Sequence, residues 1–135
     1  MKTIAFGHLN LRAPRKLLDE LFAFYTTVVG LEPGPRPPFS RFGYWLYCDG
    51  RDIVHLIEAS PDENRATGVT TTIDHVAFSC EGYADCVQRL QQAGMHFDCA
   101  SVPLTGQRQL LLRDPAGNKV ELNFPENETS PETRG

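Results

Sequence analysis

The sequence contains two copies of one pattern, and this internal repeat restricts the chain to folds that are built twice. His8 and His75 are 67 residues apart, and His55 and Glu121 are 66 residues apart. Within the copies the spacing also agrees, with 47 residues from His8 to His55 and 46 from His75 to Glu121. A repeat of this kind predicts two similar units that bury their apolar faces against each other. It also places four polar side chains about an approximate two-fold axis.

The first copy has the signals of a strand, a helix and a hairpin. Residues 4–12 alternate between apolar and polar side chains, which is typical of a half-buried strand. Apolar residues then recur every three or four positions until Gly30, so we expect an amphipathic helix that ends there. The proline-rich residues 32–43 predict a loop, and two strands follow around Asp49-Gly50, a strong hairpin signal.

The same order starts again after a polar, turn-rich segment at 60–72, which we interpret as a linker. The segment IDHVAFSC predicts a strand, and residues 83–93 predict a helix that ends at Gly94. Two further strands, RQLLLRD and NKVELNF, are predicted around Pro115-Ala116-Gly117. The polar residues 125–135 are expected to be disordered.

Composition narrows the classes of function. A chain of 135 residues is long enough for one domain. Its net charge of −4 and its scattered basic residues argue against nucleic acid as a partner. No apolar stretch is long enough to span a membrane, and the first residues do not form a secretory signal. The spacing of the four cysteines matches no zinc or redox motif, so we expect reduced thiols, a cytoplasmic protein and a small-molecule ligand.

His8, His55, His75 and Glu121 are candidates for a metal site. Each has an apolar neighbour in a predicted strand, and successive strand residues face opposite sides. The apolar neighbours are therefore expected under the helices, and the four polar side chains on the concave face of a sheet. Two histidines and a carboxylate suit non-haem Fe(II), with Mn, Ni or Zn possible. The alternative is that these histidines are hydrogen-bonded structural residues.

The chain resembles the vicinal oxygen chelate superfamily, the family of glyoxalases, bleomycin resistance proteins and extradiol dioxygenases. The resemblance covers residues 4–124 and rests on the segments GHLNLRA, FYTTVVGLEPG, DIVHLIEA, IDHVAF and LRDPAGNKVELNF. It implies an α+β fold of two tandem βαβββ modules that form a curled mixed sheet around a metal site, with helices on the outer face. It further implies one domain at 1–124, with modules at 1–60 and 72–124, followed by the polar tail 125–135.

The resemblance also implies roles for the candidate residues. His8, His75 and Glu121 match the positions of the metal ligands in the dioxygenases and thiol transferases of the superfamily. His55 matches a position that holds a fourth ligand in glyoxalase I and a histidine acid/base in extradiol dioxygenases. A glyoxalase-like lyase or isomerase would use a carboxylate there, so His55 favours a ring-cleaving dioxygenase. The leucines at 110–112 depart from the dioxygenase pattern, which has a tyrosine near this place.

Our leading hypothesis is therefore a divalent-metal-dependent enzyme that cleaves aromatic rings, with Fe(II) as its favoured cofactor. The alternatives are a glyoxalase I-like lyase or isomerase and a metal-free, drug-binding protein of the bleomycin-resistance type. Trp45, Tyr47 and Arg108 are candidate substrate contacts, because aromatic and cationic side chains suit an aromatic or anionic molecule. We also expect a homodimer, as members of this superfamily often pair modules between chains.

Overall fold

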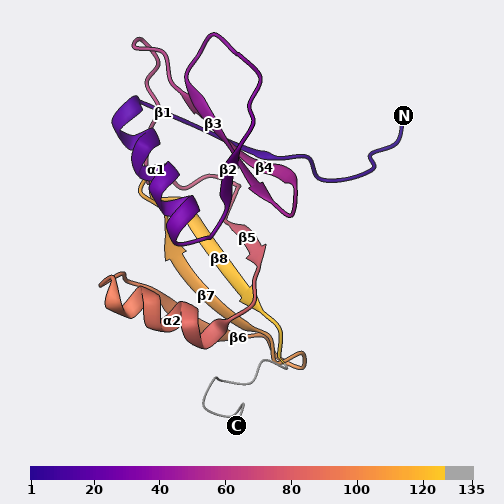
Figure 1. Ribbon diagram of the computed structural model, residues 1–135. Helices are drawn as coiled ribbons and strands as arrows, with labels where there is room; N and C mark the ends of the chain where they lie inside the picture. Colours follow the sequence, from indigo (N-terminus) through magenta and orange to yellow (C-terminus); the bar gives the residue numbers. More distant parts are fainter. Residues whose placement is uncertain (127–135) are drawn as a thin grey trace. The chain divides into compact units, whose positions relative to one another are not determined.

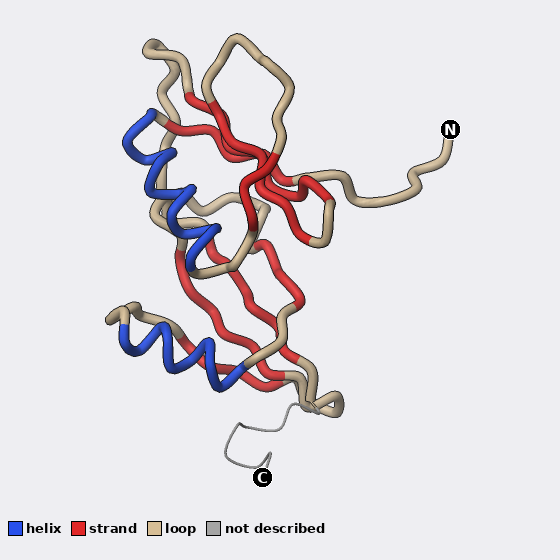
Figure 2. The backbone as a smooth tube through the Cα atoms, viewed as in Figure 1, coloured by secondary structure: helices blue, strands red, loops and turns tan. Residues whose placement is uncertain are grey.

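The computed structural model describes residues 1–126 (Figure 1). The chain forms two compact units: unit 1 is Met1–Thr67, and unit 2 begins at Gly68. In the described residues each unit contains one helix and one four-stranded mixed sheet. Figure 2 draws the helices in blue and the strands in red. The predicted α+β fold with two βαβββ modules is therefore confirmed. The boundary between the units lies inside the predicted linker at 60–72, which contains no helix or strand.

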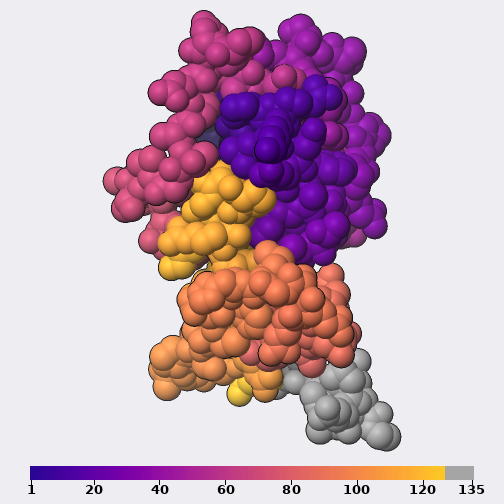
Figure 3. Space-filling model, turned by 90° about the vertical axis from the view of Figure 1, so that its left-hand side faces the viewer, coloured from indigo at the N-terminus to yellow at the C-terminus, as the bar shows by residue number. Residues whose placement is uncertain are grey.

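Unit 1 contains β1 (Leu9–Ala13), α1 (Arg15–Thr27), β2 (Glu32–Gly34), β3 (Gly43–Cys48) and β4 (Arg51–Glu58). The strand order is β1-β4-β3-β2, and β1 runs parallel to β4 while the other pairs are antiparallel. Helix α1 covers one face of this sheet (Figure 1) and buries its apolar side there. Its outer side lies on the surface, in indigo in Figure 3. The core side chains of the helix are Leu18, Leu21, Phe24 and Tyr25.

Unit 2 repeats this arrangement with β5 (Val76–Ser79), α2 (Tyr83–Gln92), β6 (Asp98–Ser101), β7 (Arg108–Arg113) and β8 (Lys119–Phe124). The strand order is β5-β8-β7-β6, again with one parallel pair, β5 and β8. Helix α2 lies along one face of the sheet (Figure 1). The buried apolar side chains of this unit are Cys86, Leu90, Leu110, Leu112, Val120, Leu122 and Phe124.

Glycines end both helices where the sequence predicts. Gly30 and Gly94 have φ values of 86° and 66°, in the left-handed region that favours glycine. In each case the next residue turns its amide back to the helix, from Leu31 to the carbonyl of Tyr25 and from Met95 to that of Leu90. The chain is thereby directed into the strand that follows.

Three predicted elements need correction. The predicted strand at 4–12 is shorter, because regular pairing with β4 begins only at Leu9. The predicted loop at 32–43 includes the short edge strand β2, whose Pro33 is tolerated because an edge strand needs no amide on its open side. Strand β6 has no counterpart among the strands predicted from the pattern, since its side chains are mostly exposed and do not alternate. Disorder is predicted for the tail 125–135. Residues 127–135 of this tail lie outside the described part of the chain.

Candidate metal centre

The pairing of the strands shows that the two units place their candidate residues equivalently. In unit 1, His55 is the partner of Asn10 on β1, two residues after His8. In unit 2, Glu121 is the partner of Ala77 on β5, two residues after His75. Each unit thus has one candidate just before its edge strand and one on the neighbouring strand. The repeat that the sequence spacing predicts is therefore also a repeat in strand register.

The apolar neighbours of these residues face the helices, and the candidates face the opposite side of each sheet. Val54 and Leu56, which flank His55, are at most 1% exposed. Val120 and Leu122, which flank Glu121, are equally buried. His55 and Glu121 are themselves only 7% and 8% exposed, which is unusual for polar side chains and requires hydrogen-bond partners.

In unit 2, His75 and Glu121 form a pair whose outer partners orient them. His75 Nε2 lies 3.6 Å from Glu121 Oε1, and His75 Nδ1 lies 2.7 Å from the Asp74 carboxylate. The hydrogen bond from His75 holds the pKa of Asp74 below its usual value, and the charge of Lys119, 3.6 Å away, acts in the same direction. Gln109 donates a hydrogen bond of 3.1 Å to Glu121 Oε1. A histidine between a carboxylate and a metal is a recurrent arrangement, because the carboxylate fixes the ring.

The donor chemistry of this pair fits a divalent transition metal. When Nδ1–H of His75 donates a hydrogen bond to Asp74, the lone pair on Nε2 is directed toward the Glu121 side. An imidazole nitrogen and a carboxylate oxygen then face the same region, and both accept a cation. Within either unit, the described residues 1–126 form no cluster of three or more His, Cys, Asp or Glu side chains that could hold a metal ion.

In unit 1, His55 lies in a stack of three rings. The His8 ring is 3.7 Å from the His55 ring on one side, and the Trp45 ring is 4.1 Å away on the other, both nearly parallel to it. His55 Nε2 makes a hydrogen bond of 2.7 Å with the Asp52 carboxylate. This bond is the main reason that the pKa of Asp52 is below its ordinary value. The imidazole of His55 is therefore held in place by both faces and by one nitrogen.

The three candidate substrate contacts have different surroundings. Trp45 lies beside His55, as the pairing of β3 with β4 requires. The hydroxyl of Tyr47 donates a hydrogen bond of 2.5 Å to the Pro35 carbonyl, so this ring braces the loop after β2. Arg108 packs its guanidinium over the ring of Tyr83, 4.8 Å from the ring centre, and the structure does not bring it to Glu121.

Three polar residues that contact the candidates, Asp52, Asp74 and Gln109, are not indicated by any periodic pattern in the sequence. All three side chains lie next to a predicted ligand or acid/base, but single polar residues in strands and turns have no periodic signal. The Asp-His dipeptide at 74–75 was the available sign. Gln109 could be found only from the strand register, which pairs Leu111 with Glu121 and so brings Gln109 to the same face of the sheet.

Other sequence predictions concern the surface and the thiols. No helix in residues 1–126 has the length and apolarity to cross a membrane. None of the four cysteines takes part in a disulfide. The side chain of His96 is 93% exposed.

Comparison with known proteins places these features in a family. The sequence model of one protein family, the Glyoxalase/Bleomycin resistance protein/Dioxygenase superfamily, matches residues 5–122. No curated protein matches the chain significantly.

Similar solved structures include a glyoxylase/bleomycin resistance protein/dioxygenase domain from Frankia sp. EAN1pec, with 19% identity, a TM-score of 0.70, and coverage of 95% of this chain and 96% of that one. A lactoylglutathione lyase from Agrobacterium tumefaciens has 23% identity, a TM-score of 0.60 and coverage of 93% and 97%. A genomically encoded fosfomycin resistance protein from Listeria monocytogenes has 15% identity, a TM-score of 0.66 and coverage of 99% and 100%. At these identities the likeness concerns the fold. The match of the family model over most of the chain shows that the protein belongs to the glyoxalase/bleomycin resistance protein/dioxygenase superfamily.

Proposed function

We propose that this protein is a divalent-metal-dependent dioxygenase that cleaves a small aromatic diol, with His8, His75 and Glu121 as the metal ligands and His55 as the acid/base. The observation that carries the proposal is the pair of His75 and Glu121, with Asp74 behind the imidazole. This pair provides a nitrogen and an oxygen donor on one face of a sheet. His8, the equivalent of His75 in unit 1, is proposed as the third ligand. Fe(II) is the favoured ion, and when bound it supplies the activation of O2 beside the substrate ring.

The surroundings of His55 support a role in proton transfer. Its Nε2 is engaged with Asp52 at 2.7 Å, which leaves Nδ1 as the nitrogen that would exchange a proton with a substrate hydroxyl. Asp52 stabilises the imidazolium that forms when Nδ1 takes up the proton. The flanking rings of His8 and Trp45 keep the imidazole from rotating.

The same contacts argue against a lyase or isomerase that moves a proton with a carboxylate. Position 55 holds no carboxylate, and the carboxylate beside it, Asp52, has a lowered pKa because it accepts a hydrogen bond from His55. A carboxylate whose proton affinity is reduced in this way is a weak base. Such chemistry would therefore have no suitable group in unit 1 near His55.

Metal content tests the proposed ligands. The apo protein is reconstituted anaerobically with equimolar Fe(II), Mn(II), Ni(II) and Zn(II), desalted and analysed for bound metal. We expect about one ion per chain in the wild type, and loss of the ion in His8→Ala, His75→Ala and Glu121→Ala. His96→Ala and Glu81→Ala are the matched controls, because both residues are exposed in unit 2. Retention of metal by Glu121→Ala would contradict the proposal.

Oxygen consumption tests the reaction. The Fe(II) form is mixed with catechol in an oxygen-electrode cell, and uptake of O2 is compared with loss of the diol. We expect equal amounts of both to be consumed. His55→Gln should retain its metal and lose about 10²- to 10⁴-fold in turnover, the usual contribution of general acid/base catalysis. Turnover of a hemithioacetal without O2 uptake would favour the lyase, and ligand binding by the metal-free protein without turnover would favour the drug-binding alternative.

A further inference from the structure

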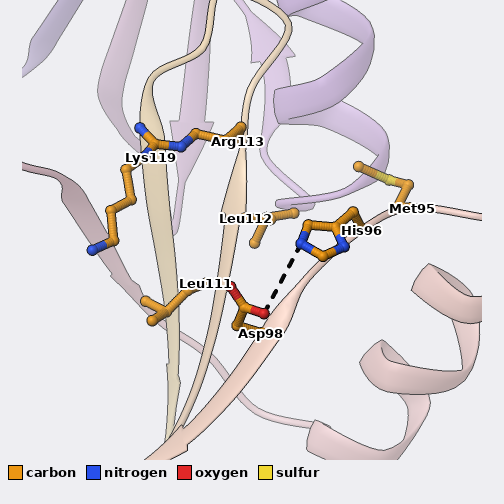
Figure 4. Close-up of a pocket in the computed structure, with 7 residues that line it drawn as sticks. All are labelled: Met95, His96, Asp98, Leu111, Leu112, Arg113 and Lys119. Carbon is orange, nitrogen blue, oxygen red and sulfur yellow. Dashed lines mark ion pairs between the residues drawn. The ribbon is translucent and has the colours of Figure 1, made fainter. Parts of the chain in front are cut away.

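Unit 2 has a cavity of about 460 Å³ on its sheet, beside the end of β7 and the loop before β6 (Figure 4). Leu111, Leu112 and Met95 provide its apolar lining. The remaining lining is polar and comes from two places, the pair of Arg113 and Lys119 and the segment that contains His96 and Asp98. A cavity of this volume lies within the range of small-molecule sites.

The repeat offers a reason for the space on this sheet. Leu111 on β7 is the partner of Glu121, whereas in unit 1 the equivalent partner of His55 is Trp45. The indole of Trp45 fills the region beside His55 and stacks on its ring at 4.1 Å. Leucine is much smaller than tryptophan, so the same position in unit 2 leaves room. The two copies therefore differ where a ligand would enter.

Charge gives this cavity a preference for acids. Arg113 and Lys119 are direct partners across β7 and β8, and both line the cavity. Among residues 1–126, Arg113 donates to the Gly117 carbonyl at 3.1 Å, and Lys119 lies 3.6 Å from the Asp74 carboxylate. A guanidinium has five N–H donors and an ammonium three, so both groups can donate further hydrogen bonds.

The acidic group in the lining is on the other side of the cavity. Asp98 Oδ1 lies 4.0 Å from His96 Nε2, and Figure 4 shows this pair across Leu111 and Leu112 from the two cations. A ligand with one anionic end and one apolar body would thus place its anion at Arg113 and Lys119 and its body on the leucines. A carboxylate can accept from both cations at once.

The cavity adjoins the candidate metal ligands of the same unit. Leu111 is paired with Glu121, and Lys119 shares the Asp74 carboxylate with His75. We propose that this cavity binds the carboxylate and the apolar body of a small organic acid, and that the substrate of the enzyme is such an acid. The assignment to substrate rests on the proposed function, whereas the binding of an acid does not.

Binding of a probe that cannot react tests the site. The full-length apo protein is titrated with phenylacetate and with its neutral analogue 2-phenylethanol, and the affinities are measured by amide chemical shifts. We expect phenylacetate to bind about tenfold or more tightly than the alcohol, with the largest shifts at Leu111, Arg113 and Lys119. Arg113→Gln should reduce the affinity for the acid to that for the alcohol. Equal binding of both probes by the wild type, or shifts confined to other residues, would overturn the proposal.

A steric variant gives a second test. Leu111→Trp introduces the side chain that unit 1 has at the equivalent position and should abolish phenylacetate binding. Leu104→Trp is the matched control, because Leu104 is fully exposed and should accept the ring without effect. Far-UV circular dichroism and metal content check that both variants are folded. Full binding of phenylacetate by a folded Leu111→Trp variant would show that the acid binds elsewhere.

The outcomes separate this proposal from the proposed function. If phenylacetate binds as expected but no metal is retained and no O2 is consumed, the acid site stands and the dioxygenase fails. If the Fe(II) form cleaves catechol but phenylacetate does not bind, the dioxygenase stands and the acid site fails. If both stand, 3,4-dihydroxyphenylacetate should be a better substrate than catechol, and Arg113→Gln should raise its KM with little change in kcat.

Discussion

Glu63 illustrates how much one carboxylate of the first unit contributes to the local structure. Its oxygens lie 2.8 and 2.9 Å from Nε of Arg12, and it accepts hydrogen bonds from the amide of Ser60 and from the guanidinium of Arg65. These donors, above all Arg12, lower its pKa to about 2. The segment after β4 is thereby attached to β1, although its sequence predicts only a polar linker.

The pH dependence of stability follows from this shift. The folded-state pKa of Glu63 is below its ordinary value of 4.5, so its contribution to stability is complete above that value. It is lost as the pH falls from about 4.5 toward 2. We expect Glu63→Gln to lower the Tm relative to the wild type at pH 7, and the difference to shrink at pH 3. Glu20→Gln, at an exposed position on α1, should have little effect at either pH, and a Glu63→Gln difference that grows in acid would contradict the assignment.

Trp45 offers a direct view of the candidate acid/base, because it is the only tryptophan in the chain. Its indole stacks on His55, and His55 stacks on His8. Binding of a paramagnetic ion such as Co(II) at His8 should quench the tryptophan fluorescence. His8→Ala should abolish the quenching, while His96→Ala should not. Quenching that persists in His8→Ala would remove His8 from the ligand set.

At the scale of elements, the strong patterns were predictable and the weak ones were not. The two helices, their glycine ends and the four central strands are long, amphipathic or bounded by turn residues, and the structure has them where the sequence predicts. Strands β2 and β6 are short and exposed edge strands. They exist because a neighbouring strand offers unpaired backbone groups, and pairing of this kind leaves no periodic pattern in the sequence.

The pairing of β3 with β4 depends on a glycine. A Cβ on Gly43 would lie 2.2 Å from the carbonyl oxygen of Leu56, and backbone cannot yield as a side chain can. We therefore expect Gly43→Ala to lower the free energy of unfolding by about 2 kcal/mol or more, as strained substitutions in packed sites do. Gly7→Ala is the control, since its Cβ would meet no atom within 4 Å. Urea denaturation measures the free energy of unfolding of both variants. Equal values would show that β3 and β4 can move apart to accept the methyl group without loss of stability.

The turn between β7 and β8 is held by an aspartate. Buried Asp114 accepts hydrogen bonds from the amides of Ala116 and Asn118 and from the Asn118 side chain, at 2.9 to 3.0 Å. Hydrogen bonds to a charged group each stabilise by about 1.5 to 3 kcal/mol. Asp114→Ala should therefore destabilise the protein by about 2 to 4 kcal/mol in urea denaturation. Asp98→Ala, at an exposed site on β6, should lower the free energy of unfolding far less. A comparable loss of stability in Asp98→Ala would argue that the hydrogen bonds of Asp114 do not cause the destabilisation.

At the scale of the whole molecule, the repeat was the most informative feature of the sequence. It predicted two units of one topology, and the strand registers agree with it residue by residue at His55 and Glu121. What the spacing could not predict is how each copy has diverged. One copy has a histidine held by Asp52 and covered by Trp45, and the other has a glutamate beside a leucine and a cavity. The spacing identifies which side chains differ between equivalent positions, but their contacts depend on packing that the spacing does not specify.

The oligomeric state is also a property of the whole molecule, and it can be predicted and measured. We expect a homodimer, with a mass of about 30 kDa by light scattering after size exclusion, twice the 15.1 kDa of one chain. A mass of one chain at micromolar concentration would contradict it. The protein concentration should be varied, because a weak dimer dissociates on dilution.

Metal binding should couple the stability of the two units, since the proposed ligands belong to both. His8 precedes β1 in unit 1, while His75 and Glu121 belong to unit 2. An ion that binds only the folded protein stabilises it by about 2.7 kcal/mol at a free concentration one hundred times Kd. We therefore expect Ni(II) or Zn(II) to raise the Tm of the wild type, and His8→Ala and Glu121→Ala to lose this rise equally. A metal-induced rise that survives in His8→Ala but not in Glu121→Ala would confine the metal to unit 2, and then the equivalence of the two histidines would be one of fold and not of function.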